Sequence, residues 1–121
     1  MTSFDFSNIT TLNGSVFYES GLSGTLSIPN LTGVLNGAEF YKCTGLTSIT
    51  NLGSITSICD NPYTSGGVVI GSFANCTGLT SVIIPSTVTK IGKCAFDECT
   101  SLSQVNCTWQ NITEVGYGAF K

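Results

Sequence analysis

The stretch Phe73–Phe96 reads FANCTGLTSVIIPSTVTKIGKCAF, and it begins and ends on the same signature. Phenylalanines in a similar context recur along the chain at Phe17, Phe40, Phe73, Phe96 and Phe120. They are separated by 23, 33, 23 and 24 residues. A fixed period in the twenties is typical of a solenoid, in which each repeat forms one coil. The single long step predicts one insertion between the second and third copies.

Other positions of the repeat keep the same register. In three copies the third residue after the phenylalanine is a cysteine and the sixth is a leucine: Cys43, Cys76, Cys99, Leu46, Leu79 and Leu102. The first copy has Ser20 in the cysteine position. One coil cannot bury its apolar side chains alone, so stacked coils must share a continuous core. We therefore expect the phenylalanines, cysteines and leucines to form structural ladders inside the stack.

The central copy also contains two short strand patterns. Over residues 81–84, Val82 and Ile84 form every second position, which indicates a strand with one face inward. Pro85 ends this strand because proline lacks the backbone donor that a sheet needs. A second alternation over residues 88–92 predicts another strand on the opposite wall of the coil.

These residues resemble a known repeat family. The order Ala-Phe, two residues, Cys, then Leu-Thr-Ser-Val, Ile-Pro and Val-Thr-x-Ile-Gly resembles the BspA-like leucine-rich repeat, whose repeats have about 23 residues. The resemblance is strongest over residues 73–107 and covers nearly the whole chain. It implies a right-handed, β-rich leucine-rich-repeat solenoid with short strands and irregular or one-turn helical connections. Members of this family occur on bacterial and protozoan surfaces, which implies adhesion or binding to host matrix proteins or other bacteria.

The repeat divides the chain as follows. We expect a single domain over residues 1–121, because 121 residues suit one domain. Its expected parts are a partial N-terminal coil at 4–16, repeats starting near 17, 40, 73 and 96, an insertion at 60–69, and a truncated coil at 120–121. The first ten residues lack the basic and apolar regions of a secretory signal. The location is therefore open between the cell surface or secretion, for a fragment of an exported protein, and an intracellular or particle-associated site.

Composition argues against several classes of function. Charged residues make up 9% of the chain, the formal net charge is -3, and there is neither histidine nor arginine. Nucleic acid is an unexpected partner, because phosphate binding needs a basic patch. Histidine is the commonest general base near neutral pH and the commonest metal ligand. We therefore expect no catalytic residues, no metal and no cofactor, and no apolar run is long enough for a membrane span.

Six cysteines allow more than one interpretation. Cys43, Cys76 and Cys99 share one repeat position, so we expect buried free thiols there. A disulfide framework is the alternative if the protein is exported, with Cys94 and Cys99, or Cys107 and a neighbour, as pairs. Zinc is less favoured, since the chain has no C-x-x-C pair and no histidine.

The departures from the repeat are the candidate partner contacts. Insertions in repeat proteins map to loops, often on the binding face, and this one carries polar and aromatic residues. Aromatic residues are also enriched at interfaces. The candidates are Asp60, Asn61 and Tyr63 in the insertion, Tyr18 and Tyr41 directly after the phenylalanines, and Trp109 at a turn. The alternatives are a tolerated loop without a ligand and, for Trp109, a packing lid.

Two functions follow from the sequence. The first is a non-enzymatic module of adhesion type that binds a protein or a glycan. The second is a small structural subunit of a larger assembly, a virion or a cell-surface layer, that docks through uncapped solenoid ends near Ile9 and Phe120. Repeat arrays usually cover their ends with polar caps, and no such cap is evident, so self-association through the ends is also expected.

Overall fold

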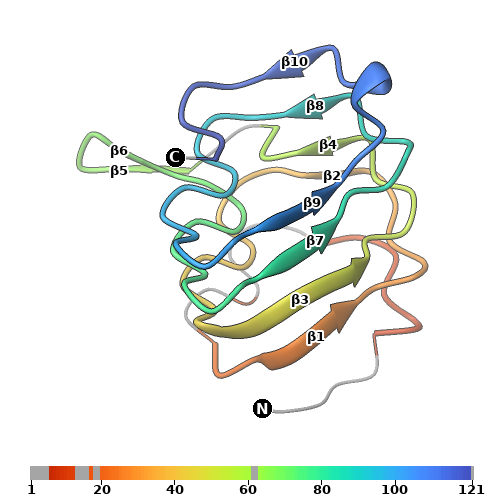
Figure 1. Cartoon of the computed structure of the whole chain (residues 1–121), viewed down its shortest axis with the longest axis horizontal. Helices are drawn as coiled ribbons and strands as arrows, with labels where there is room; N and C mark the ends of the chain where they lie inside the picture. The colour runs from red at the N-terminus through yellow and green to blue at the C-terminus, as the bar shows by residue number, and fades with distance from the viewer. Residues whose placement is uncertain (1–5, 13–16, 18–19, 61–62, 121) are drawn as a thin grey trace.

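The protein is a β-solenoid, seen in a computed structural model that describes residues 6–12, 17, 20–60 and 63–120. Two parallel four-stranded sheets form opposite walls of the stacked coils (Figure 1). The first sheet has the order β1 (Ser23–Ser27), β3 (Gly45–Asn51), β7 (Ser81–Ile83), β9 (Gln104–Asn106). The second has the order β10 (Glu114–Val115), β8 (Lys90–Ile91), β4 (Ser57–Ile58), β2 (Val34–Leu35). The predicted β-rich solenoid is confirmed.

Helix is nearly absent from the described residues. The 3-10 helix η1 (Trp109–Asn111) lies at the corner between β9 and β10 (Figure 1). Most other connections between the two walls are turns and irregular segments, as expected for a chain whose polar residues are mainly Ser, Thr, Asn and Gly. The two walls are close enough to share one core, which the inward residues of both sheets fill.

The strand register aligns the repeats. Val82 of β7 pairs with Ile49 of β3 on one side and Val105 of β9 on the other. On the opposite wall, Ile91 of β8 pairs with Ile58 of β4. Each strand thus places an aliphatic side chain directly above its equivalent in the coil below, and the core continues from coil to coil.

Five phenylalanine rings stack along the interior. The rings of Phe17, Phe40, Phe73, Phe96 and Phe120 follow one another at centroid distances of 5.3, 5.0, 5.3 and 5.3 Å, with interplanar angles of 2–10°. Phe40, Phe73 and Phe96 are almost fully buried. Stacking of this kind stabilises beyond the area that the rings bury.

The cysteine row lies beside the phenylalanines and is hydrogen-bonded to them. Each thiol donates to the backbone carbonyl of the phenylalanine in the preceding coil: Cys43 Sγ to Phe17 O at 3.1 Å, Cys76 Sγ to Phe40 O at 3.2 Å, and Cys99 Sγ to Phe73 O at 3.1 Å. All six cysteines are free thiols in this structure. The thiols therefore join successive coils as small, partly polar core residues.

Glycine follows β6 and β8 at places where two coils approach closely. A Cβ atom on Gly92 would lie 1.9 Å from the carbonyl oxygen of Cys59, and one on Gly71 would lie 1.9 Å from that of Cys94. Backbone atoms cannot move aside as a flexible side chain can. A side chain at Gly71 or Gly92 would therefore disturb the stacking of the coils at these two positions.

The extra residues of the long step form a hairpin. β5 (Tyr63–Ser65) pairs antiparallel with β6 (Val68–Ile70), and the hairpin projects from the stack (Figure 1). Gly66 and Gly67 join the strands with φ angles of 56° and 81°. A two-residue hairpin loop of type I′ needs positive φ angles at both central residues, which glycine adopts without strain. The hairpin thereby leaves the coil and returns to it without disturbing the register between Ile58 and Ile91.

The two ends of the stack differ. At the N-terminal end Phe6 is buried and packs edge-on against Phe17, with ring centroids 5.5 Å apart and an interplanar angle of 72°. Leu12 is also buried, and Ile9 is partly buried. At the C-terminal end Phe120 remains 39% exposed. Described residues therefore cover the first ring of the ladder, while the last ring stays accessible.

Candidate functional site

The hairpin encloses a polar cavity against the second sheet. This hairpin cavity has a volume of about 350 Å³. Its lining residues come from the hairpin and from the coils that carry β4, β8 and β10: Cys59, Asp60, Thr64, Val69, Lys90, Lys93, Glu114 and Gly116. The hairpin contributes Thr64 and Val69 to the lining, so the insertion forms one side of this concave surface.

One lysine of the cavity is held by two carboxylates. Lys90 Nζ lies 3.5 Å from Asp60 Oδ1 and 3.8 Å from Glu114 Oε2, and it donates a hydrogen bond of 3.2 Å to the Asp60 carbonyl. Ser57 Oγ donates to Asp60 Oδ1 at 3.2 Å. All these groups are partly exposed except Ser57, so each ion pair contributes little to stability. Together they fix the position of the Lys90 ammonium.

The second lysine of the cavity is differently placed. Lys93 is exposed, and within the described part of the chain its ammonium group has no ion pair. Its backbone carbonyl accepts a hydrogen bond of 3.2 Å from Cys59 Sγ. The cavity thus contains two acids and two lysines, of which Lys93 alone offers a cation without a neutralising neighbour.

The structure distributes the sequence-derived candidate contacts over several places. Asp60 lines the hairpin cavity. Tyr63 begins β5, and only its backbone is described. Tyr41 is half-buried, away from both cavities. Asn61 and Tyr18 lie outside the described residues.

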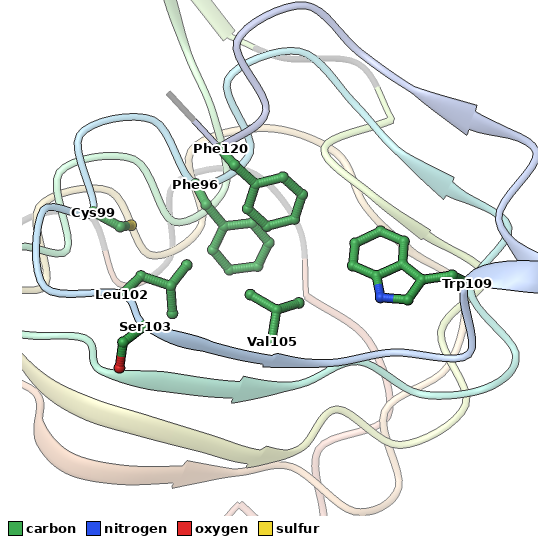
Figure 2. A pocket seen from close by; sticks show the side chains of 7 residues that line it. All are labelled: Phe96, Cys99, Leu102, Ser103, Val105, Trp109 and Phe120. Carbon is green, nitrogen blue, oxygen red and sulfur yellow. The ribbon is translucent and has the colours of Figure 1, made fainter.

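Trp109 lies at a second, apolar cavity on the C-terminal end of the stack. This end cavity measures about 250 Å³, and its lining residues are Phe96, Cys99, Leu102, Ser103, Val105, Trp109 and Phe120. Figure 2 shows the Trp109 ring opposite the stacked rings of Phe96 and Phe120. The ring centroids of Trp109 and Phe120 are 6.3 Å apart, at 65°. Half of Trp109 stays exposed, so it covers the end only in part.

Three functional-site candidates were missed from sequence: Lys90, Lys93 and Glu114. Ser57, Lys90 and Glu114 are paired with one another across the second sheet. Aligning the copies would have placed Lys90 and Glu114 side by side, since they occupy the same register position. The ion pair between Lys90 and Asp60 joins adjacent coils, since the backbone N–H of Asp60 donates to Leu35 O in the preceding coil and its carboxylate accepts from Ser57. The repeat pattern does not indicate this contact, because Asp60 begins the inserted residues.

A buried acid was also missed, and it is structural. Glu39 is fully buried directly before Phe40. Its carboxylate accepts hydrogen bonds from the backbone N–H groups of Asn36 at 2.7 Å and Gly37 at 3.1 Å, and from Ser72 Oγ at 3.1 Å. A buried carboxylate is tolerated when it is fully hydrogen-bonded. Both oxygens are occupied, so Glu39 closes a turn and has no capacity left for a ligand.

The thiols are poorly suited to nucleophilic chemistry. Burial raises the pKa of Cys59 and of Cys99 to about 11. Burial also raises the pKa of Cys43, Cys76 and Cys107. A thiol reacts as its thiolate, so a raised pKa leaves these five groups mostly in the less reactive protonated form near neutral pH. Within the described residues no group of three or more His, Cys, Asp or Glu could hold a metal ion.

Comparison with known proteins places the chain in a repeat family. The sequence profile of the BspA type leucine rich repeat region matches six copies over residues 1–66 and 68–121. The chain therefore belongs to the BspA-type leucine-rich repeat family. Proteins of this family are often exported or surface-located, and leucine-rich repeats typically serve protein interaction without catalysis.

A solved structure has the same fold. The crystal structure of a leucine-rich repeat protein from Bacteroides ovatus ATCC 8483 matches with a TM-score of 0.61 and 24% sequence identity. The match covers 93% of this chain and 26% of that protein, so this chain spans about a quarter of its length. No curated protein matched the chain. Among the described residues, no helix is long and apolar enough to cross a membrane.

Proposed function

We propose that this chain is a non-enzymatic interaction module of adhesion type, which binds a protein or glycan partner at the cell surface or after secretion. Family membership over nearly the whole chain carries this proposal. The site chemistry is compatible with it, because the hairpin cavity places charged and hydroxyl side chains beside an exposed loop.

The hairpin is the proposed contact surface. It is the largest departure from the repeat, and with β4, β8 and β10 it forms the hairpin cavity. Most of its described residues are exposed, including Thr64, Gly66, Gly67 and Val68. Exposed loops on a rigid scaffold are common places for binding residues.

Deletion of the hairpin tests this proposal. Removing residues 60–69 leaves Ile58 and Phe73 with the same separation as Ile91 and Phe96. We expect the wild-type chain to bind at least one member of a panel of immobilised extracellular-matrix proteins and polysaccharides, measured by biolayer interferometry. The deletion variant should lose that binding by at least about tenfold, or 1.4 kcal/mol. Binding that survives the deletion would place the contact surface elsewhere, and a panel without any binding would refute the adhesion function.

A second candidate function is a structural subunit that docks through its C-terminal end. The end cavity and the exposed rings of Trp109 and Phe120 favour it. The outer edges of β9 and β10 have no partner strand within the described part of the chain. Unpaired strand edges beside apolar side chains readily pair with another chain. The partner in this function is a second copy or another subunit of a virion or cell-surface layer.

A further inference from the structure

We propose that the hairpin cavity binds a sugar that carries one carboxylate, such as a single uronic acid at the end of an otherwise neutral glycan. This inference rests on the proposed interaction function and names a ligand class for one surface. The cavity volume of about 350 Å³ lies within the range of small-ligand sites, at its lower end. Such a volume suits one sugar unit better than a folded protein surface.

Lys93 supplies the cation for the carboxylate. Its ammonium group is free of ion pairs within the described residues, whereas Lys90 is held between Asp60 and Glu114. A free ammonium keeps its three donors for a ligand. A charge-assisted hydrogen bond from Lys93 to a carboxylate is about twice as strong as a neutral one.

The other polar groups of the cavity suit hydroxyl groups. Asp60 and Glu114 are exposed carboxylates, and carboxylate oxygens accept hydrogen bonds from several donors at once. Thr64 adds a hydroxyl that both donates and accepts. Val69 contributes an apolar wall against which the C–H face of a sugar ring can pack. A ligand with many hydroxyls and an apolar face uses all of these groups.

The charge balance of the cavity selects against other ligands. Two acids and two lysines give no net charge, so a polyanion gains no overall attraction. An acidic peptide or a phosphate group would bring several negative charges close to Asp60 and Glu114. A neutral sugar would leave Lys93 without a partner. One carboxylate among several hydroxyls matches the arrangement of charges best.

Titrations followed by NMR test the proposal. The ¹⁵N-labelled chain is titrated separately with glucuronate, glucose, acetate and inorganic phosphate. Glucuronate should shift the amide signals of Thr64, Val69, Lys93 and Gly116, because these residues line the cavity. Glucose and acetate should each bind about tenfold more weakly, since each lacks one half of the recognised chemistry. Raising the ionic strength should weaken glucuronate binding, because salt screens exposed charges.

Two matched lysine variants make the test specific. Lys93→Gln should weaken glucuronate binding about tenfold, while Lys42→Gln, at another exposed lysine outside the cavity, should leave it unchanged. Equal binding of glucose or acetate, tighter binding of phosphate, or shifts confined to other residues would overturn the proposal. A partner that binds equally to the wild type and Lys93→Gln would leave the interaction function intact while excluding this ligand class.

Discussion

Phe96 is a core residue that packs against the coils on both sides of its own coil. Its ring lies between those of Phe73 and Phe120, at 5.3 Å from each, with angles of 6° and 2°. Only 1% of the residue is exposed. Neighbouring rings belong to successive coils that are joined by strand pairing, so the structure cannot collapse around a missing ring without shifting the strands.

Phe96→Ala should therefore lower the free energy of unfolding by roughly 3–5 kcal/mol, as for other buried phenylalanine truncations. The measurement is urea unfolding followed by far-UV circular dichroism. Phe120→Ala is the matched control, because this ring is partly exposed and its loss should cost less. An unchanged unfolding midpoint for Phe96→Ala would contradict the ring stack.

Because its thiols are buried, we expect the protein to lose folding stability at alkaline pH. Cys59 and Cys99 have a folded pKa near 11, above the ordinary value of about 8.5 in an unfolded chain. Their contribution to stability is fully present below about pH 8.5 and is lost as the pH rises to about 11. The unfolded state then gains by releasing protons that the folded state retains.

The free energy of unfolding should fall by roughly 2 kcal/mol for each of these two thiols between pH 8.5 and pH 11. Urea unfolding in the presence of a reductant measures it. Cys99→Ala should reduce the slope of stability against pH, whereas Cys94→Ala, at a less buried thiol, should change it less. Identical slopes for the wild type and Cys99→Ala would show that the thiol is not protected by burial.

The hairpin is the element that distinguishes this solenoid from a regular repeat. Among the residues that the structure describes, its strands pair only with each other, and it joins the stack at Cys59 and Gly71. The register between β4 and β8 is the same as that between β2 and β4, so the insertion leaves the ladder undisturbed.

Deleting residues 60–69 should therefore preserve the fold. We expect the melting temperature of the deletion variant to stay within a few degrees of the wild type, because the core ladders do not pass through the hairpin. Thermal unfolding by circular dichroism measures this change. A variant that fails to fold would show that the hairpin stabilises the coil, and the binding test would then rely on Lys93→Gln instead.

At the scale of the molecule, the two ends have different chemistry. The N-terminal end is covered by Phe6 and Leu12, whereas the C-terminal end exposes Trp109 and Phe120. If the C-terminal end of one molecule stacked on the N-terminal end of another, Phe6 and Leu12 would lie between the two cores and hinder the contact. Two C-terminal ends can face each other about a two-fold axis, which brings β9 of one copy antiparallel to β9 of the other.

Residues 1–121 should therefore form a concentration-dependent dimer, measured by sedimentation velocity. Trp109→Lys should weaken dimerisation by more than about tenfold, because it places a charge in the apolar interface. Val68→Lys is the matched control, since Val68 is an exposed apolar residue on the hairpin, away from this end. A strict monomer at high concentration would count against the structural-subunit function.

Most of the fold could be predicted from the repeat pattern. The 23-residue spacing of Phe17 and Phe40 and of Phe73 and Phe96 indicated the coils, and the alternation around Val82 indicated the strands. The prediction is possible because each repeat contacts only its neighbours. The position of a residue within its repeat therefore determines where that residue lies in the stack. The hairpin loop was also accessible from sequence, because Gly66 and Gly67 permit a tight return.

The sequence by itself thus determined the period, the inward ladders and the place of the insertion, because these depend on residues at fixed separations. Only the tertiary structure decided that Lys90 lies between Asp60 and Glu114, that Glu39 is buried, and that the two ends differ. These features depend on contacts between residues of different coils that depart from the repeat consensus. No periodic pattern encodes such a contact, and the candidate binding cavity lies at one of them.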